Sequence, residues 1–280
     1  MSALAEVASV EIAEDICALP LVRRLAAMLD RDPASLREGD ALPRGWHVSL
    51  FNPPTRQSEL RSDGAASLGV RLPDIGLPRL MLGGRQVRFV GDIPIGAHLR
   101  RETTQGEVKV KEGRSGRFAL VPVERRIFVS GSAEPAVIER QEYLLREAAG
   151  SAAPAAVAAA PAAGTRSPAD AERALLPDER LLFRYSAITD NPHRIHYDQQ
   201  YATAGEGYPA LVVNGSIPAM FLLELFRACA GREPAAFSSR NVAPMLCGRP
   251  LRLCARREGT AWKLWVEDEY GALAFDAHAE

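Results

Sequence analysis

The sequence feature that most constrains the fold is a stretch in the last third of the chain that is apolar on almost every side of a helix. Residues 216–230 read SIPAMFLLELFRACA, and Glu224 and Arg227 form a single small polar patch within it. A helix that is apolar nearly all round is a buried helix. Gly231 suits its end, because glycine readily takes the left-handed conformation found there. Other elements of the chain must therefore surround this helix.

Extended segments account for this surrounding layer, because apolar and polar side chains alternate with a period of two between turn residues. After the buried helix we predict strands at residues 234–242, 250–257, 261–267 and 273–279. Before it we predict strands at residues 85–90, 97–110, 117–129, 136–145 and 181–186. Helices are predicted at residues 19–29 and 198–204. This mixture indicates an α+β fold in which antiparallel strands wrap around a helix.

An alanine- and proline-rich segment divides the chain. Residues 148–171 read AAGSAAPAAVAAAPAAGTRSPADA, where the three prolines prevent one continuous helix and almost nothing large is available for burial. We interpret residues 148–172 as a linker between residues 1–147 and residues 173–280. Each of these two parts is long enough to form a core of its own.

Charge excludes one large class of function. The net charge of −1 argues against a nucleic-acid-binding protein, which usually carries a concentrated basic surface. All but three of the 34 basic residues are arginine, whose planar fork suits phosphates and carboxylates. We attribute most of this excess to a general arginine and alanine bias of the sequence.

Cysteine usage and hydropathy bear on the compartment. The four cysteines have neither metal-ligand nor disulfide-framework spacing. No segment is long and apolar enough to span a bilayer, and residues 1–15 lack the pattern of a signal peptide. We expect a cytoplasmic protein without membrane association.

The motif that carries chemistry is YSAITDNPHRIHYD, which ends at Asp198, followed by an Asn214-Gly215 pair just before the buried helix. The first N–H groups of a helix have no partners within the helix, and its N-terminus carries partial positive charge. Such an end can stabilise the oxygen of a polarised thioester carbonyl. His196 has a side chain suited to exchanging a proton with water near neutral pH.

These residues resemble the MaoC-like hot-dog dehydratases and hydratases that act on acyl thioesters. The family motif reads approximately Thr-Gly-Asp-x-Asn-Pro-x-His, followed by a His-Gly pair at the central helix, and TDNPHRIH and NGS are the matching stretches here. The stretches HRIHYD, GWHVSLFNP, LPRLMLGG and VKEGRSG resemble the branch of type-2 hydroxyacyl-thioester dehydratases and of itaconyl-CoA and mesaconyl-CoA hydratases. The resemblance implies a double hot-dog fold, with a non-catalytic first part that contributes the substrate cavity and a catalytic second part.

The motif departs from the family pattern at its acid. The family has an aspartate five residues before the active histidine, and Asn191 holds that place here, with Asp190 one residue away. Aligning the Asn-Pro pairs instead would place Arg194 at the histidine position. The resemblance implies that Gly215 N–H polarises the thioester carbonyl, because that role needs no side chain. His193 is either a second proton carrier or a residue that packs the loop.

The implied reaction is reversible hydration of a short branched or dicarboxylic 2-enoyl-CoA, with itaconyl-CoA or mesaconyl-CoA converted to citramalyl-CoA. We expect water to be held by His196 with Asp190 or Asn191. No cofactor and no metal are expected, and a homodimer of such chains is an open expectation. The residues expected to bind substrate are Tyr185, Arg194, Tyr197, Asn214, Ser216, Arg79 and Arg85. The arginines considered for a distal carboxylate are Arg56, Arg61, Arg79, Arg85 and Arg194.

Several alternatives remain open at this point. A fatty-acid type of 3-hydroxyacyl-thioester dehydratase would use the same motif with a longer apolar tunnel. A hot-dog thioesterase shares the fold and the ligand, and a non-catalytic acyl-thioester binding protein would have lost its acid. A metal site at His193, His196 and Asp198 ranks lower, because no fourth ligand completes the set. Gly215-Ser216 lacks the second glycine of a serine-hydrolase elbow.

The first part of the chain contains no helix comparable to residues 216–230 in length or apolarity. That absence suits a wide acyl cavity. The first part also has no counterpart of TDNPHRIH, and its histidines, His47 and His98, lie in no comparable context. We therefore expect one active site, built by the second part and covered by the first.

Overall fold

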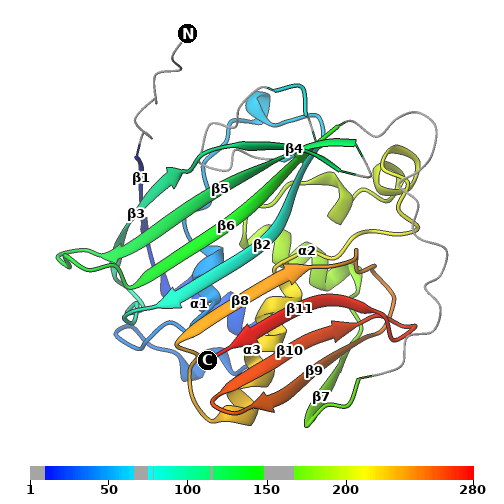
Figure 1. The fold of residues 1–280 in the computed structure, drawn as a ribbon. Coiled ribbons are helices and arrows are strands. Elements are labelled where there is room, and N and C mark those ends of the chain that lie inside the picture. The colour runs from blue at the N-terminus through cyan, green and yellow to red at the C-terminus, as the bar shows by residue number, and fades with distance from the viewer. Residues whose placement is uncertain (1–9, 66–74, 78, 114–115, 148–166) are drawn as a thin grey trace.

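The computed structural model describes residues 10–65, 75–77, 79–113, 116–147 and 167–280 (Figure 1). The strands of the first half are β1 (Glu11–Ile16), β2 (Arg79–Phe89), β3 (His98–Gln105), β4 (Lys109–Gly113), β5 (Gly116–Val129) and β6 (Val137–Arg146). Those of the second half are β7 (Ala171–Leu175), β8 (Ala236–Asn241), β9 (Leu251–Glu258), β10 (Ala261–Glu267) and β11 (Leu273–Ala279). The α-helices of the described residues are α1 (Leu19–Met28), α2 (Glu179–Ile188) and α3 (Ile217–Ala230). The short helical turns are Pro33–Ser35, Trp46–Ser49, Gln57–Glu59, Arg194–His196 and Tyr201–Gly205.

The strands of both halves join in one antiparallel sheet whose order is mirrored about its centre. The order is β1-β3-β5-β6-β2 and then β8-β11-β10-β9-β7, with β4 paired to β5 beside this path. Each position in the first half has its counterpart in the second, and β2 pairs with β8 at the junction. Figure 1 shows the two halves as separate curved layers on either side of this junction.

The buried helix lies where the sequence places it. Helix α3 begins at Ile217, ends at Ala230 and is capped by Gly231 in the left-handed conformation, with φ 65°. It packs against β7, β9, β10 and β11 (Figure 1). Its exposure is confined to the end where Glu224 and Arg227 lie, and these two side chains form an ion pair of 2.7 Å.

Two predictions of local structure are wrong. Residues 181–186 form part of helix α2, not a strand. The reason is local, because the Asp178 carboxylate caps the helix by accepting from Leu181 N–H at 2.9 Å. Leu182 and Tyr185, three positions apart, then share the buried face.

The predicted strand at residues 97–110 is broken into β3 and β4. The break lies opposite Pro122 of β5, since β3 pairs with β5 as far as Val123 and β4 pairs from Leu120 onward. A proline has no N–H to donate to a ladder. At this point Gly106 N–H instead donates to the Pro122 carbonyl at 2.8 Å.

The two halves share their main core. One continuous cluster of buried hydrophobic side chains includes Leu25 of α1 and Phe226 of α3, and a smaller cluster lies under β5 and β6. Although each part is long enough for a core of its own, the two halves share one, because α1 packs on α2 and β2 pairs with β8. The proposed linker lies mostly outside the described residues, and its boundaries stay a prediction.

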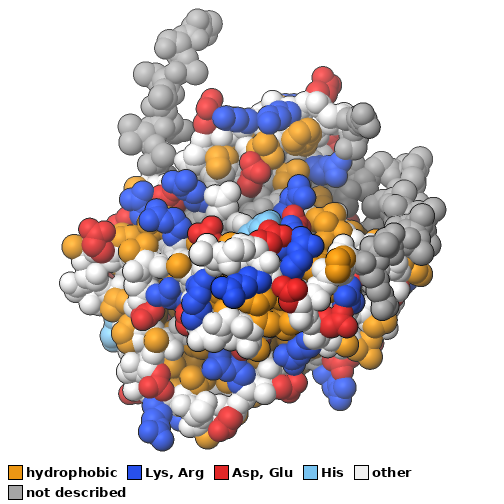
Figure 2. Space-filling model, turned by 60° about the horizontal axis from the view of Figure 1, so that its bottom comes forward, with side chains coloured by type: hydrophobic (Ala, Val, Ile, Leu, Met, Phe, Trp, Pro, Cys, Tyr) orange, Lys and Arg blue, Asp and Glu red, His pale blue; other side chains and the backbone are white. Residues whose placement is uncertain are grey.

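Two surface properties complete the description. Among the described residues, no helix has the length and hydropathy needed to cross a membrane. On the face shown in Figure 2, basic and acidic side chains are interspersed without a large patch of either sign.

Candidate active site

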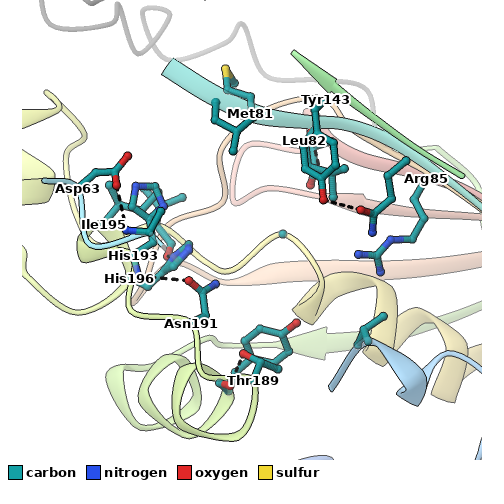
Figure 3. Close-up of a pocket in the computed structure, with 18 of the residues that line it drawn as sticks. Asp63, Met81, Leu82, Arg85, Tyr143, Thr189, Asn191, His193, Ile195 and His196 are labelled. Carbon is teal, nitrogen blue, oxygen red and sulfur yellow. Dashed lines mark hydrogen bonds between the residues drawn. The ribbon is translucent and has the colours of Figure 1, made fainter. Parts of the chain in front are cut away.

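A cavity of about 810 Å³ lies between the two halves. One wall is the inner face of β2, β3, β5 and β6, and the opposite wall is the loop that follows α2 together with the turn before α3. His193 and His196 line it from the second half, and Leu82, Arg85 and Tyr143 line it from the first (Figure 3). The sheet that lines the cavity belongs to the half without a long central helix.

His196 is buried in this wall with one ring nitrogen already committed. Its Nδ1 lies 2.8 Å from the Val212 carbonyl oxygen. A carbonyl only accepts, so Nδ1 carries the proton and Nε2 keeps its lone pair. Burial lowers the pKa of His196 from 6.5 to about 4, and the neighbouring His193 acts in the same direction. The ring is thus neutral at pH 7 and suited to accept a proton.

His193 stands edge-on to His196, with 5.5 Å between the ring centroids. Its backbone N–H donates to the Asn191 side-chain oxygen at 3.2 Å, which fixes the turn between them. Burial lowers the pKa of His193 as well. Both rings are therefore held next to each other at one end of the cavity (Figure 3).

Asn191 and Asp190 both line the cavity but differ in setting. Asp190 is exposed and has φ 45°, a left-handed conformation that is uncommon outside glycine. Asn191 is half-buried, its N–H donates to Ser186 O at 2.9 Å, and its side chain lies beside the histidines (Figure 3). An amide in this position can hold water by hydrogen bonds, although it cannot act as a base.

The turn before α3 supplies a hydrogen-bond donor. Gly215 lines the cavity, and its N–H donates to no other residue within the described part of the chain. A Cβ at Gly215 would lie 3.4 Å from the amide of Asn241, in ordinary van der Waals contact. Because α3 starts at Ile217, the helix dipole points its positive end here.

Tyr185, Ser216 and Arg85 meet beside this donor. Arg85 Nη2 lies 3.4 Å from Ser216 Oγ. Burial raises the pKa of Tyr185, with the Ser216 hydroxyl next to it acting in the opposite direction. Arg85 is also ion-paired to Glu139, with 2.8 Å between Nε and Oε1. The helix start is thereby connected to the opposite wall of the cavity.

Other candidate binding residues lie elsewhere. Arg194 is paired with Asp198 at 2.8 Å and stacks on the Tyr201 ring at 4.2 Å, away from the cavity wall. Tyr197 is 52% exposed. Asn214 is buried behind the site, where its Nδ2 donates to Ser186 Oγ at 3.3 Å.

The remaining arginine candidates also differ in whether they line the cavity. Arg61 lines the cavity and pairs with Asp63 at 3.2 Å, whereas Arg56 is exposed and pairs with Glu59. The side chain of Arg79 lies outside the described residues. Among the residues that the structure does describe, no group of three histidine, cysteine, aspartate or glutamate side chains is arranged to hold a metal ion.

A further set of charged and polar residues on the sheet wall was not predicted from the sequence. They lie on β3, β5 and β6 and are Arg101, Arg125, Glu139, Gln141 and Tyr143. Their signal was strand periodicity. Arg125 is in phase with the buried Val121 and Val123 of β5, and Glu139 is in phase with the buried Val137 of β6. A charge at an inward position of a strand indicates a polar cavity behind it.

His47 was also missed as a neighbour of the site. It lies in the short turn Trp46–Ser49, is buried, and its Nε2 is 3.1 Å from Glu139 Oε2. No motif surrounds His47 in the sequence. Its position depends on a contact between residues 92 positions apart in the chain.

Three comparisons with known proteins bear on the family and the fold. The family described as hydroxyacyl-thioester dehydratase type 2 matches residues 45–247. The mesaconyl-C(4)-CoA hydratase of Chloroflexus aurantiacus is 38% identical over 272 residues, which cover 96% of this chain and 94% of that protein.

Solved structures match in fold. A MaoC-like dehydratase of Phytophthora capsici superposes with a TM-score of 0.70 at 15% identity, covering 97% of this chain and 94% of the other. A Mycobacterium tuberculosis protein described as having a double hotdog fold superposes with a TM-score of 0.56 at 14% identity, covering 98% of this chain and 95% of the other. These matches confirm the predicted α+β double hot dog. The chain therefore belongs to the hydroxyacyl-thioester dehydratase type 2 family and is a hydro-lyase of the MaoC-like type.

Proposed function

We propose that this protein catalyses the reversible hydration of a short 2-enoyl-CoA whose acyl group carries a second carboxylate. Mesaconyl-CoA, with citramalyl-CoA as product, is the substrate that fits best. One observation carries the proposal: a neutral buried histidine and a free helix-terminal N–H line the same cavity as a wall rich in arginine. The similarity to a mesaconyl-C(4)-CoA hydratase supports the choice of acyl group.

The proposed reaction starts at the thioester carbonyl. Gly215 N–H donates to the carbonyl oxygen, and the positive end of α3 stabilises the negative charge that develops there. Electron density is thereby withdrawn from the β-carbon, which becomes open to attack by water. No side chain is needed for this step, which explains how Asn214 can replace the histidine of the family's His-Gly pair.

Water is the second reactant. Nε2 of His196 accepts one proton from water while the Asn191 amide holds the oxygen, and a C–O bond forms at the β-carbon. The electron pair of the double bond moves to the α-carbon, where the carbonyl stabilises it. The His196 imidazolium then returns its proton to the α-carbon, so the net change is addition of one water. His193 and Asp190 belong to the same loop and lie close enough to influence this proton transfer.

The charged wall beside the helix start supports a second carboxylate. The guanidinium of Arg85, which belongs to this wall, lies 3.4 Å from the hydroxyl of Ser216, the residue after Gly215. A carboxylate attached to the β-carbon would therefore face this wall within a few bonds of the polarised carbonyl. A long apolar chain would instead meet charged groups in the same space, at a desolvation cost.

The test is a side-by-side assay of mesaconyl-, itaconyl-, crotonyl- and octenoyl-CoA with the purified protein. We expect the dicarboxylic substrates to react fastest. An equal or higher kcat/KM for octenoyl-CoA would overturn the dicarboxylic assignment in favour of the fatty-acid type of dehydratase. Release of free coenzyme A would indicate a thioesterase, and binding without turnover would indicate a non-catalytic binding protein.

A further inference from the structure

Four neighbouring strands of the first half carry charged or polar side chains at positions that face the cavity. In the register of the sheet, Arg125 of β5 lies opposite Glu139 of β6, and Arg85 of β2 lies opposite Gln141 of β6. Arg101 of β3 lies beside Arg125, whose direct partner on β3 is Thr103. Three cations and one anion thus share this part of the wall.

Glu139 is the single acid of the group, and its carboxylate contacts three neighbouring side chains. It is ion-paired with Arg85 at 2.8 Å, faces His47 Nε2 at 3.1 Å and accepts from Gln141 Nε2 at 2.6 Å. Despite its burial, these contacts and the charge of Arg125 hold the pKa of Glu139 well below its usual range. Its negative charge is therefore committed to Arg85 and to the groups around it.

Arg101 has no anionic partner of this kind. Its Nη1 donates to the Phe51 carbonyl at 3.3 Å, and its Nε is buried without a hydrogen-bond partner. Within the described part of the chain, no carboxylate lies at ion-pair distance from it. Burial and the nearby Arg125 lower the pKa of Arg101 to about 10. It remains charged at neutral pH, with a binding face that lines the cavity.

Phe51 holds Arg101 in this position at a conformational cost. The Arg101 guanidinium lies 5.0 Å from the centre of the Phe51 ring. Phe51 itself has φ 60°, which is strained for a bulky side chain. Its N–H donates to the Asp15 carboxylate at 2.6 Å, which ties the strained residue to β1. Strain of this size persists where the surrounding contacts hold the residue firmly, as they do around ligand-binding sites.

We propose that Arg101 binds the second carboxylate of the acyl group, with Arg125 adding positive potential beside it, and so determines substrate specificity. The inference rests on the proposed function and deepens it. A guanidinium fork can take a carboxylate by two parallel hydrogen bonds. Arg101 lines the cavity, so its guanidinium can meet such a ligand there.

This assignment also relates the arginines to the helix start. Arg85 is in contact with Ser216 at the start of α3, and through Glu139 it belongs to the same charged group as Arg101. A ligand whose thioester carbonyl meets Gly215 therefore faces these arginines in the same cavity. The site selects dicarboxylic acyl thioesters over neutral ones of the same length.

Binding of saturated thioesters tests the proposal without the reaction. Succinyl-CoA and butyryl-CoA have similar lengths, cannot be hydrated, and differ in one terminal carboxylate. By calorimetry we expect the unmodified protein to bind succinyl-CoA about 100-fold more tightly, since losing one partner of a buried charged contact costs on this order. Arg101→Met should abolish this preference and leave butyryl-CoA affinity within about threefold, because its apolar contacts remain.

Two further variants serve as controls. Arg100→Met changes the neighbouring residue of β3, which pairs with Glu102 and stacks on Phe128 instead of lining the cavity, and should keep the full preference. Arg101→Lys keeps the charge and loses the planar fork, so an intermediate preference is expected even if the methionine variant folds poorly. A preference for succinyl-CoA that survives in both Arg101 variants would overturn the proposal.

Hydration kinetics separate this inference from the proposed function. If the unmodified protein hydrates mesaconyl-CoA and Arg101→Met shifts the ratio of kcat/KM toward crotonyl-CoA by about 100-fold, both stand. If the unmodified protein hydrates neither substrate but loses succinyl-CoA binding in Arg101→Met, the function fails and the carboxylate site stands. If mesaconyl-CoA is hydrated and the ratio is unchanged in Arg101→Met, the site fails and the function stands.

Discussion

The two halves of the sheet follow the same strand order and enclose different contents. In the second half, α3 fills the concave face with nine buried side chains. In the first half the corresponding place holds the turn Trp46–Ser49, and the cavity lies against β2, β3, β5 and β6. Matching isolated bridges, Ala41 with Pro94 and Val212 with Leu246, precede the turn and the helix and mark the equivalent points.

This difference has a chemical consequence. A packed helix requires apolar partners, so β9, β10 and β11 present Leu253, Leu264 and Phe275 to it. A cavity has no such requirement, and inward positions on the first half hold Arg125 and Glu139 instead. Charges at these positions would be costly against a packed helix, because buried charges must be paired or solvated. Because no long helix fills this place, there is room both for the cavity and for charged side chains on its wall.

The largest effect is expected where the second half supplies the chemistry. His196→Ala should lower kcat by about 10²–10⁴-fold, because proton transfer by a positioned histidine contributes that much. Steady-state hydration of mesaconyl-CoA measures it, and His98→Ala, a change at an exposed histidine of the first half, is the matched control. Full activity of His196→Ala would remove the catalytic role from this half.

The buried state of His196 also predicts how stability depends on pH. Its pKa falls from 6.5 to about 4 on folding, so between these pH values the unfolded chain binds a proton and the folded protein does not. The contribution is fully present above pH 6.5 and is lost progressively as pH falls toward 4, by about 3 kcal/mol in all. Urea unfolding of the unmodified protein and of His196→Gln across this interval should show a smaller pH dependence in the variant. An equal dependence of the free energy of unfolding on pH in the two proteins would contradict this prediction.

The contact between the halves can be tested at Gly45, which precedes the turn of the first half. Gly45 has φ 98°, and a methyl group there would overlap Leu223 of α3. Gly45→Ala should lower the free energy of unfolding by about 2 kcal/mol or more, from backbone strain and overpacking together. Gly231→Ala shares the positive φ but has open space around it, and should cost about 1 kcal/mol. Equal losses in thermal unfolding would mean that the turn does not press on α3.

The smallest effect is expected at Asn214. Its Nδ2 donates to Ser186, whereas its Oδ1 is buried without a hydrogen-bond partner in the structure. Asn214→Ala removes both groups. The free energy lost with the hydrogen bond and the free energy gained by removing the unpartnered carbonyl should offset each other to within about 1 kcal/mol. Denaturant unfolding checks this value. A loss above about 2 kcal/mol would show that the carbonyl has a partner that holds the turn before α3.

Local patterns predicted much of the second half correctly. The apolar periodicity of residues 216–230 predicted α3 and its end at Gly231, and the strands after it were predicted within two residues at each end. The same type of reasoning failed at residues 181–186, where a short apolar run fits a strand as well as a helix. The capping Asp178, three residues before this run, was the signal that favours the helix.

The candidate site was predicted only where a motif exists. TDNPHRIH and Asn214-Gly215 indicated His193, His196, Asn191 and Gly215, and all four line the cavity. Arg101, Arg125 and Glu139 belong to no motif, and each is an ordinary charged residue in its own strand. Arg85 was named among several arginines with no means of choosing between them, and only its contacts with Ser216 and Glu139 distinguish it.

The sequence by itself determined the buried helix, most of the strands around it, and the candidate histidine and glycine of the site, because each depends on residues close together in the chain. The tertiary structure alone decided the pairing of β2 with β8, the shared core and the arginine wall. These features depend on residues from separate strands meeting at one face. Strand periodicity predicts to which face of the sheet a side chain points, but only the register of the sheet decides which residues it contacts.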